Sequence, residues 1–532
     1  MNVLSIASFV VFTGIIAAVS WYKSRKNRMH TLSGLFLANR SLTFLFVGGA
    51  LLFSNINTAT IIGENELTYT NNMTVMAWGM TSVLAMLLVS EFIIPIYLRT
   101  GIATTPDYLA ARYDRSTASV VSLVFLVSYV VNLLPTVLYS GALAFNGLFH
   151  FSEVWGTDYW TTIWILVWIM GAVGGLYSML GGLKAIAVSD TLLGLGIFLG
   201  GILLPFFGLR YLGHGSIGQG LHTLLSVHTE HLDAIGSKRD AVPFSTLFTG
   251  MLLVNLYYWG TEQYIVQQVL ASRDLEASQK GIAVACVGKI ISPLLLNVPG
   301  LIAVHLFTHL SNTAEVFPKL DSLVSPPLIA GYIAAIIFGA GMTTFNAGLN
   351  SSSTLFVLNV YKPWLERRSR QVPERDLVRV ARRFEAAVCL AAMCIAPFIV
   401  FARKGFYTYI QTVNGFFNVP IFTIMFMGFV TRRVPALAAK IGLAFFILSY
   451  AALELVWDIH VHFLHILAML FVLTCGLMLL IGRIYPQPVP YVQRVNNLVG
   501  ITPWKNRHIY AAVLIVLMVA MFLIFSPLGL AK

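Results

Sequence analysis

The amino-acid sequence predicts an all-α protein that crosses a membrane many times, with about fourteen transmembrane helices. Three observations predict this fold class: the composition, the recurrence of apolar stretches and the distribution of basic residues. Of the 532 residues, 57% are hydrophobic and 11% are charged, whereas a soluble domain carries about 25% charged residues. A long chain with so few charges cannot cover its surface with polar groups, so lipid is the expected solvent.

Apolar stretches of roughly 20 residues, each long enough to cross the hydrocarbon core of a bilayer, recur along the whole chain. They lie at 2–22, 43–68, 74–98, 116–147, 159–182, 185–212, 243–270, 279–309, 324–359, 383–402, 406–430, 434–457, 462–482 and 508–528. Each stretch is interpreted as one membrane-spanning helix.

Lysine and arginine gather in alternate loops between these stretches. One set of loops holds the basic runs at 23–28, 99–115, 362–383 and 432–433, while the other set holds few basic residues. The positive-inside rule places the first set in the cytoplasm, so both termini are expected outside a plasma membrane, the inner membrane of a bacterium. This placement explains the formal net charge of +12. The expected partner is therefore the lipid bilayer and not nucleic acid, and the oligomeric state stays open.

The loops divide the chain into five predicted regions. They are an N-terminal helix with its basic loop (1–42), a first five-helix repeat (43–212), an outer loop (213–242), a second five-helix repeat (243–433) and C-terminal peripheral helices (434–532). The outer loop holds His214, His222, His228 and His231 in a spacing that matches no metal-ligand pattern. It is interpreted as a solvated loop.

Polar residues inside an apolar span are costly and usually functional. The densest group is Ser54, Asn55, Asn57, Thr58 and Thr60 in the second span. Such side chains offer the backbone alternative hydrogen bonds, so this stretch is predicted to break the helix. A break at mid-membrane frees carbonyls that can coordinate a cation, although packing through small polar residues is the alternative.

Three further groups stand out. Asn255, Tyr258 and Glu262 combine amide, aromatic and acidic groups in the seventh span, which suits a solute with both an apolar face and hydroxyls. Lys289 lies about two turns inside the eighth span, where it needs a partner, a water-filled cavity or a snorkelling route to the surface.

The fourth group comprises the adjacent hydroxyls of Thr343 and Thr344. They follow a Gly-Ala-Gly stretch, and together with backbone oxygens they suit a hard cation. Asp190, a single acid in the sixth span, could serve as a second ion site, a proton carrier or an ion-pair partner.

In this order, the groups resemble the sodium:solute symporter family, and within it the sodium/sugar cotransporter branch. The segments that carry the resemblance are Gly101–Asp107, Tyr177–Ala185, Asn255–Gly260, Gln279–Ile282, Leu349–Ser353 and Tyr409–Gln411. The resemblance implies a core of two inverted five-helix repeats, whose two broken helices face each other at the membrane midplane. It implies a sodium-coupled importer of a small polar solute, a sugar or sugar derivative, and no enzymatic activity.

Carried over position by position, the resemblance implies two sites. The sodium site would use the backbone carbonyls of Phe53, Ile56 and Ala340 and the hydroxyls of Thr343 and Thr344, with Asp190 near the ion path. The solute site would use Asn55, Ser82, Asn255, Lys289 and Gln411, with Tyr258 as an inner gate and Tyr407 as an aromatic wall. A second sodium site of some members is not expected, because its serine positions are Asn346 and Ala347 here.

The chain departs from the sugar-transporting relatives at two places. Those relatives carry Glu-Gln in the first broken helix and a Glu in the next helix, where this chain has Ala59-Thr60 and Gly79. Two hydroxyl acceptors are therefore missing while Lys289 is kept, so the hypothesis is an anionic or substituted sugar, such as a sugar acid. Glu64 and Glu66, about one turn further along, could restore the negative charge.

Two alternative functions remain open on the same fold. The first is a proton-coupled symporter with Asp190 as the proton carrier, and the second is a sensor that binds solute and signals through the basic loop 362–383. No output domain is recognisable after the last span, which argues against the sensor.

Overall fold

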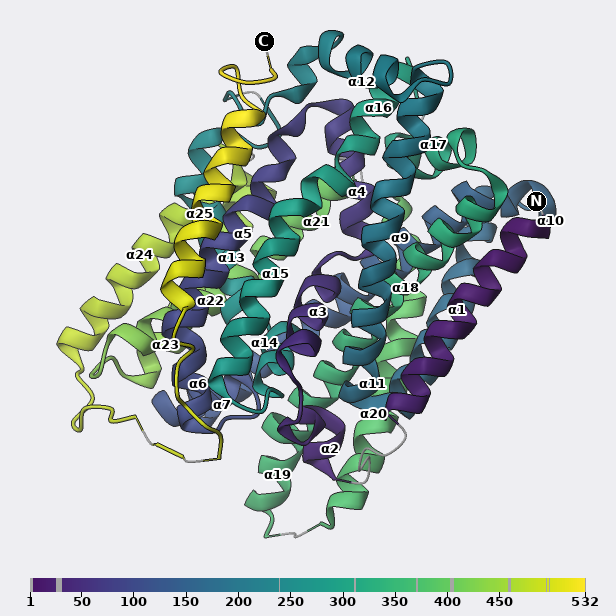
Figure 1. The fold of residues 1–532 in the computed structure, drawn as a ribbon. Helices are drawn as coiled ribbons and strands as arrows, with labels where there is room; N and C mark the ends of the chain where they lie inside the picture. The colour runs from purple at the N-terminus through teal and green to yellow at the C-terminus, as the bar shows by residue number, and fades with distance from the viewer. Residues whose placement is uncertain are drawn as a thin grey trace.

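The computed structural model is all-helical over the part of the chain that it describes (Figure 1). It describes residues 3–24, 31–238, 240–310, 312–369, 372–401, 406–457, 461–493, 495–496 and 498–531, with the backbone alone at 24, 180–182, 406–408 and 455.

The helices follow one another along the chain with short connections. The α-helices are α1 (Val3–Ser24), α2 (Leu32–Leu37), α3 (Phe44–Asn55), α4 (Thr58–Thr70), α5 (Met76–Leu88), α6 (Ile94–Thr100), α7 (Thr105–Arg112), α8 (Arg115–Ser128), α9 (Leu134–Phe149), α10 (Phe151–Trp155), α11 (Tyr159–Leu212), α12 (Ile217–Ser226), α13 (Gly250–Gly260), α14 (Gln263–Leu270), α15 (Leu275–Leu296), α16 (Val298–Leu306), α17 (Val316–Val324), α18 (Pro327–Leu355), α19 (Lys362–Arg367), α20 (Glu374–Ile395), α21 (Phe406–Gly415), α22 (Asn418–Val430), α23 (Ala436–Ala451), α24 (Phe463–Ile484) and α25 (Arg507–Ile524). Short 3₁₀ turns lie at Ala38–Arg40, Met73–Val75, Thr229–Leu232, Phe244–Phe248, Thr313–Glu315 and Ala396–Phe401.

Within the described ranges, twelve helical segments are long and apolar enough to cross a membrane, and the pair α3 and α4 forms a thirteenth span that is bent by 53°. The long helix α11 contributes two of the twelve, Tyr159–Met179 and Leu183–Leu212. The remaining expected span, 243–270, consists of α13 and α14, two short helices that meet at Thr261 and Glu262. The predicted fold class is thus confirmed. The α3–α4 break lies where the polar residues of the second span had predicted it, and α13–α14 is the second broken helix that the resemblance implied.

π-helical turns widen three of the spans just before a proline. They lie at Val89–Ile93, Tyr129–Leu133 and Phe356–Tyr361, and Pro95, Pro135 and Pro363 each follow two residues after the turn ends. A proline lacks the N–H group, and its ring collides with the carbonyl four residues earlier. A wider turn moves that carbonyl away, so each helix continues through its proline.

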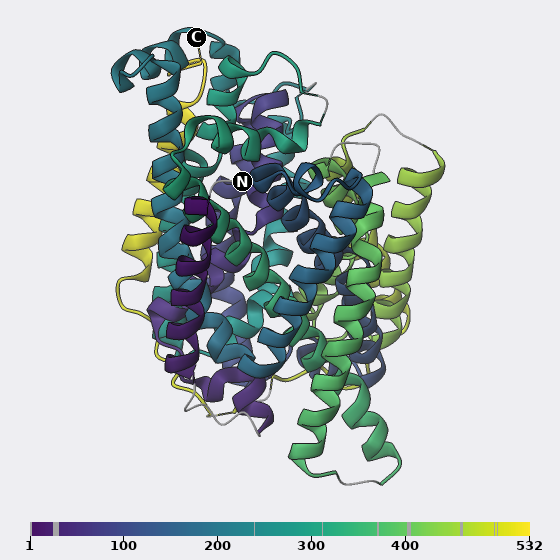
Figure 2. The same cartoon turned by 90° about the vertical axis from the view of Figure 1, so that its right-hand side faces the viewer.

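The two ends of the helix bundle collect different loops. In Figure 1, α2, α6, α7 and α19 lie at the lower end, where the basic loops are, and α12, α16 and α17 lie at the upper end. Figure 2 shows the C-terminus at this upper end and the N-terminus in the upper half of the bundle. The arrangement matches the alternation of basic loops along the sequence. The division into five regions remains a prediction.

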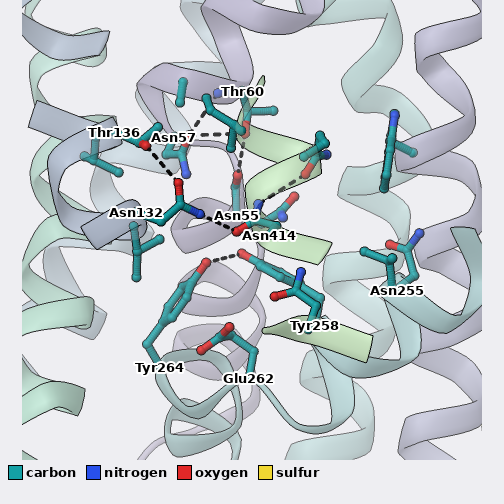
Figure 3. A pocket seen from close by; sticks show the side chains of 18 of the residues that line it. Asn55, Asn57, Thr60, Asn132, Thr136, Asn255, Tyr258, Glu262, Tyr264 and Asn414 are labelled. Atoms are coloured by element: carbon teal, nitrogen blue, oxygen red, sulfur yellow. Dashed lines mark hydrogen bonds between the residues drawn. The ribbon is translucent and has the colours of Figure 1, made fainter. Parts of the chain in front are cut away.

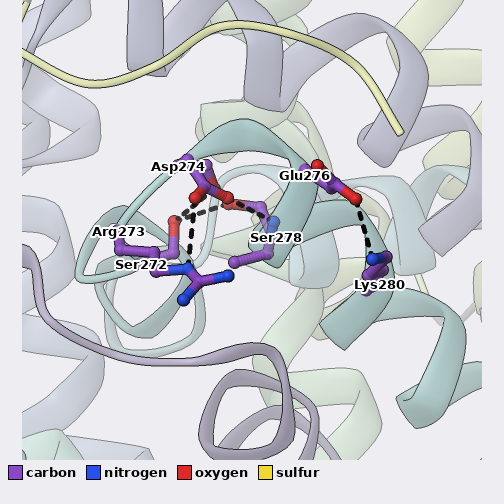
Figure 4. Close-up of polar contacts among 7 residues, drawn as sticks. Ser272, Arg273, Asp274, Glu276, Ser278 and Lys280 are labelled. Atoms are coloured by element: carbon purple, nitrogen blue, oxygen red, sulfur yellow. Dashed lines mark hydrogen bonds and ion pairs between the residues drawn. The ribbon is translucent and has the colours of Figure 1, made fainter. Parts of the chain in front are cut away.

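A polar turn at 272–280 starts α15 directly after the second broken helix (Figure 4). The Asp274 carboxylate accepts a hydrogen bond of 2.6 Å from the backbone N–H of Ala277 and so caps the first turn. The Ser272 and Ser278 hydroxyls are 2.6 Å apart, and Lys280 forms an ion pair of 2.7 Å with Glu276. An N-cap of this kind satisfies N–H groups that have no partner within the helix.

Candidate functional site

A cavity of about 150 Å³ lies between the two broken helices. Its wall is formed by the α3–α4 and α13–α14 breaks together with α5, α9, α15, α21, α22 and the π turn at Tyr129–Leu133. Figure 3 shows side chains from these elements converging on one space. Amides, hydroxyls, aromatic rings and three charged side chains line the cavity, which therefore suits a small polar solute.

Six of the seven predicted solute residues line this one cavity: Asn55, Ser82, Asn255, Tyr258, Lys289 and Gln411. They come from five different helices and are up to 356 positions apart in the chain, from 55 to 411. The Ser82 hydroxyl donates a hydrogen bond of 2.6 Å to the Asn255 side chain, which links α5 to α13. The side chain of Tyr407 lies outside the described residues. Contact of these residues with a solute remains a prediction.

Further cavity residues were not predicted from the sequence. Asn132 and Asn414 are joined by a hydrogen bond of 2.7 Å across the cavity, and Thr136 donates to Asn132 at 3.4 Å (Figure 3). In the sequence, Asn132 is a single amide in an apolar run, Val130-Val131-Asn132-Leu133. One amide in a span is also compatible with helix packing, so only the packing of the π turn at Tyr129–Leu133 against α21 places it at the cavity.

The first helix breaks because Asn57 caps the start of α4. The Asn57 side chain accepts a hydrogen bond of 2.9 Å from the backbone N–H of Thr60, and its own N–H turns to the carbonyl of Asn55 at 3.0 Å. In an unbroken helix, that N–H would bond the carbonyl of Phe53, four residues earlier. The carbonyls of Phe53 and Ser54 thus lose their helical partners at mid-span.

Two threonines of α18 meet these freed carbonyls. The Thr343 hydroxyl lies 3.4 Å from the Phe53 carbonyl and 3.1 Å from the Ala340 carbonyl, and the Thr344 hydroxyl donates to the Ser54 carbonyl at 2.8 Å. Four of the five predicted sodium ligands therefore adjoin one another. The fifth, Ile56, is buried at the C-terminal end of α3. Hydroxyl and carbonyl oxygens are the ligands that a hard cation prefers, so the donor set fits sodium.

Asp190 is buried next to this cluster. The Ser54 hydroxyl donates to Asp190 at 2.9 Å, and the Gln268 side chain donates to the same hydroxyl at 2.7 Å. One oxygen of the Asp190 carboxylate has no hydrogen-bond partner within the described part of the chain. Ser54 thus connects the threonine cluster, the buried acid and α14.

The second break forms the floor of the cavity. Glu262 lies between α13 and α14, and its carboxylate accepts hydrogen bonds from Tyr257 at 2.6 Å and from Tyr129. The Tyr258 and Tyr264 hydroxyls are 2.7 Å apart (Figure 3). The Tyr258–Tyr264 pair and Glu262 therefore lie at the lower side of the cavity in this view. Tyr258 and Glu262 both line the cavity, and the gating role of Tyr258 remains a prediction.

A family model described as the sodium:solute symporter family matches residues 35–445. Over 529 residues, the chain is 39% identical to the "Uncharacterized symporter YidK" of Escherichia coli, covering 99% of this chain and 92% of that protein. It is also 25% identical to a sodium/glucose cotransporter of Vibrio parahaemolyticus, covering 83% of each chain. A human sodium/myo-inositol cotransporter is 27% identical over 86% of this chain and 67% of its own.

Among solved structures, a sodium-coupled sialic acid symporter in a substrate-bound outward-open state has a similar fold. It matches with a TM-score of 0.77 and 20% sequence identity, over 92% of this chain and 99% of that one. At this identity, the likeness shows the shared fold, including the inverted-repeat core. The chain therefore belongs to the sodium:solute symporter family, as an integral multi-pass membrane protein that transports a solute with sodium as the coupling ion and is not an enzyme.

Proposed function

We propose that this symporter imports a small polyhydroxylated solute, a sugar or sugar derivative, by alternating access across a bacterial inner membrane, with both termini outside. The observation that carries the proposal is the shared position of two sites on one broken helix. Asn55 lines the solute cavity, while the carbonyls of Phe53 and Ser54, directly before it, meet the threonines of α18. Sodium bound there would fix the backbone conformation of the α3–α4 break. That conformation determines where Asn55 lies in the cavity wall.

Such sharing gives the coupling a physical basis. When one ligand orders an element that also forms the other site, each ligand raises the affinity of the other by the same factor. The chemistry of the cavity supports a solute rich in hydroxyls, because amide and hydroxyl side chains can both donate and accept. Two of the relatives are sodium/glucose and sodium/myo-inositol cotransporters, and the solutes in their names are polyhydroxylated.

The sodium gradient is sufficient for accumulation. One sodium ion that moves inward down about 100 mV gains about 2.3 kcal/mol. A tenfold concentration gradient adds about 1.4 kcal/mol, so the sum of about 3.7 kcal/mol supports a several-hundred-fold accumulation of a neutral solute.

A thermal-stability screen of the purified protein tests the proposal. Neutral sugars, sugar acids, inositols and amino acids are each added in sodium and in choline, since a ligand that binds the folded state alone raises the melting temperature. The expected result is a shift with sugars or inositols that is larger in sodium. A shift with amino acids alone would contradict the solute class. Equal shifts in both salts would contradict the sodium site and favour proton coupling or a sensor.

A further inference from the structure

Two opposite charges face the solute cavity from different helices. Lys289 of α15 is 3% exposed, Glu64 of α4 is 4% exposed, and both line the cavity. Lys289 therefore points into this polar space and does not reach for the membrane surface. Glu64 was one of two acids that could offset Lys289, and the other, Glu66, instead accepts a hydrogen bond of 2.7 Å from Thr313 of an outer loop.

Neither charge is paired within the described part of the protein. The Lys289 ammonium and the Glu64 carboxylate interact electrostatically but are further apart than 4.0 Å, the limit for an ion pair. Neither side chain makes a hydrogen bond with a described residue. The third charged group of the cavity, Glu262, differs because its two oxygens are taken by Tyr129 and Tyr257.

Buried charges without a partner are unfavourable unless a ligand pairs with them or forms hydrogen bonds to them. A carboxylate accepts hydrogen bonds and an ammonium donates them, whereas a hydroxyl does both. A solute with several hydroxyls can therefore donate to Glu64 and accept from Lys289 without carrying a charge. An anionic solute would satisfy Lys289 but bring a like charge close to Glu64, and a cationic one would do the reverse.

We infer that Glu64 and Lys289 together select a solute of zero net charge and that Glu64 is the hydroxyl acceptor of this site. The carboxylate thus supplies, from about one turn further along α4, the acceptor that Ala59-Thr60 and Gly79 lack. This inference rests on the proposed function. It replaces the expectation of an anionic sugar, because Glu64, one of the two acids that could restore the negative charge, lines the cavity with Lys289.

The test compares sodium-driven uptake or binding of matched hexoses in proteoliposomes, using glucose and galactose, their uronic acids and glucosamine. Wild type is expected to favour the neutral sugars by about tenfold or more over both charged classes. Glu64→Gln leaves Lys289 uncompensated, so preference should move at least about tenfold toward the uronic acids. Lys289→Gln should move it toward glucosamine.

Two controls keep the outcome interpretable. Glu66→Gln removes a buried carboxylate of the same helix that does not line the cavity, and it should leave the order of preference unchanged. Glu64→Gln with Lys289→Gln removes both unpaired charges of the cavity together, so this variant should fold even where a single variant does not. It should bind neutral sugars more weakly and lose discrimination by charge.

Preference of the wild type for uronic acids, or an unchanged order in Glu64→Gln, would overturn the inference while the proposed sugar transport stands. Absence of sodium-dependent binding for every sugar and inositol would overturn the proposed function, and this inference with it.

Discussion

The two broken helices solve the same backbone problem in opposite ways. At the α3–α4 break, the carbonyls of Phe53 and Ser54 lose their helical donors and meet hydroxyls of α18. At the α13–α14 break, the Tyr257 carbonyl accepts from the N–H groups of both Thr261 and Glu262, at 2.7 and 2.9 Å. The Gly260 carbonyl accepts from the Tyr97 hydroxyl at 2.9 Å.

This difference shows what makes a helix break an ion site. An unsatisfied carbonyl inside a membrane is costly, so a break must be completed by the protein or by a ligand. At the second break, backbone N–H groups and a tyrosine hydroxyl satisfy the free carbonyls. At the first break, the carbonyls contact threonine hydroxyls, which a bound cation could replace as partners. The first break is therefore suited to a cation and the second to a rigid cavity floor.

The largest effect is expected at the first break. In Thr343→Val with Thr344→Val, both hydroxyl oxygens are lost at nearly constant volume. Apparent sodium affinity, measured from the sodium dependence of uptake or of the melting temperature, should fall about 100-fold, which corresponds to about 2.8 kcal/mol. The matched control is Thr423→Val, because the Thr423 hydroxyl is buried but bonds the Val419 carbonyl of its own helix at 2.7 Å. Unchanged sodium affinity in the double variant would show that the freed carbonyls are not the ion site.

The second prediction tests whether the α13–α14 break stabilises the fold without binding sodium. Glu262→Gln keeps the shape of the side chain but replaces one carboxylate oxygen with an amide NH₂ group. This group cannot accept the hydrogen bond that a tyrosine hydroxyl donates to Glu262. The free energy of unfolding should fall by about 2 kcal/mol, since hydrogen bonds to charged groups contribute about 1.5–3 kcal/mol. The rise in melting temperature on adding sodium should persist. If that rise disappears instead, the two breaks are not separable in function.

The helix α17, which packs against α4 next to the first break, makes the stability of the protein depend on pH. Asp321 of α17, which packs against α4, is fully buried, and its burial raises the pKa of this carboxyl from 3.8 to about 7. The folded protein therefore holds the proton more tightly than the unfolded chain. Stability is highest below about pH 4, falls as the pH rises to about 7 and is constant above that.

The melting temperature of the wild type should accordingly fall between about pH 4 and pH 7, and this fall should be smaller in Asp321→Asn. An equal fall in both proteins would assign the pH dependence to other groups.

The smallest effects are expected at the turn that follows the second break (Figure 4). Asp274→Ala removes the cap of α15 and should cost about 1 kcal/mol of stability. Glu276→Gln removes an ion pair whose partners are 48% and 37% exposed, and it should cost less than about 0.5 kcal/mol. A larger cost for Glu276→Gln than for Asp274→Ala would contradict this order.

The family resemblance implied a second broken helix, but the polar residues of the second span predicted the α3–α4 break themselves, because local competition for backbone hydrogen bonds decides where a helix stops. Asn57 illustrates this, since its side chain caps the helix that begins at the next residue. Asn132 and Asn414 were not predicted, because a single amide in an apolar span says nothing about its partner 282 positions away. The spacing of Glu64 and Glu66 also could not show that Glu64 lines the cavity while Glu66 accepts a hydrogen bond from Thr313.

The sequence by itself determined the properties that depend on neighbouring residues: a lipid environment, the number of spans within one or two, the position of the first break and the alternation of basic loops. Only the tertiary structure decided which polar groups meet, such as Thr344 with Ser54 and Glu262 with two tyrosines, and which face the same cavity, such as Glu64 and Lys289. The physical reason is that helix formation and interruption follow from local hydrogen bonding. The direction and partner of a buried side chain, by contrast, depend on how helices distant in the chain pack together.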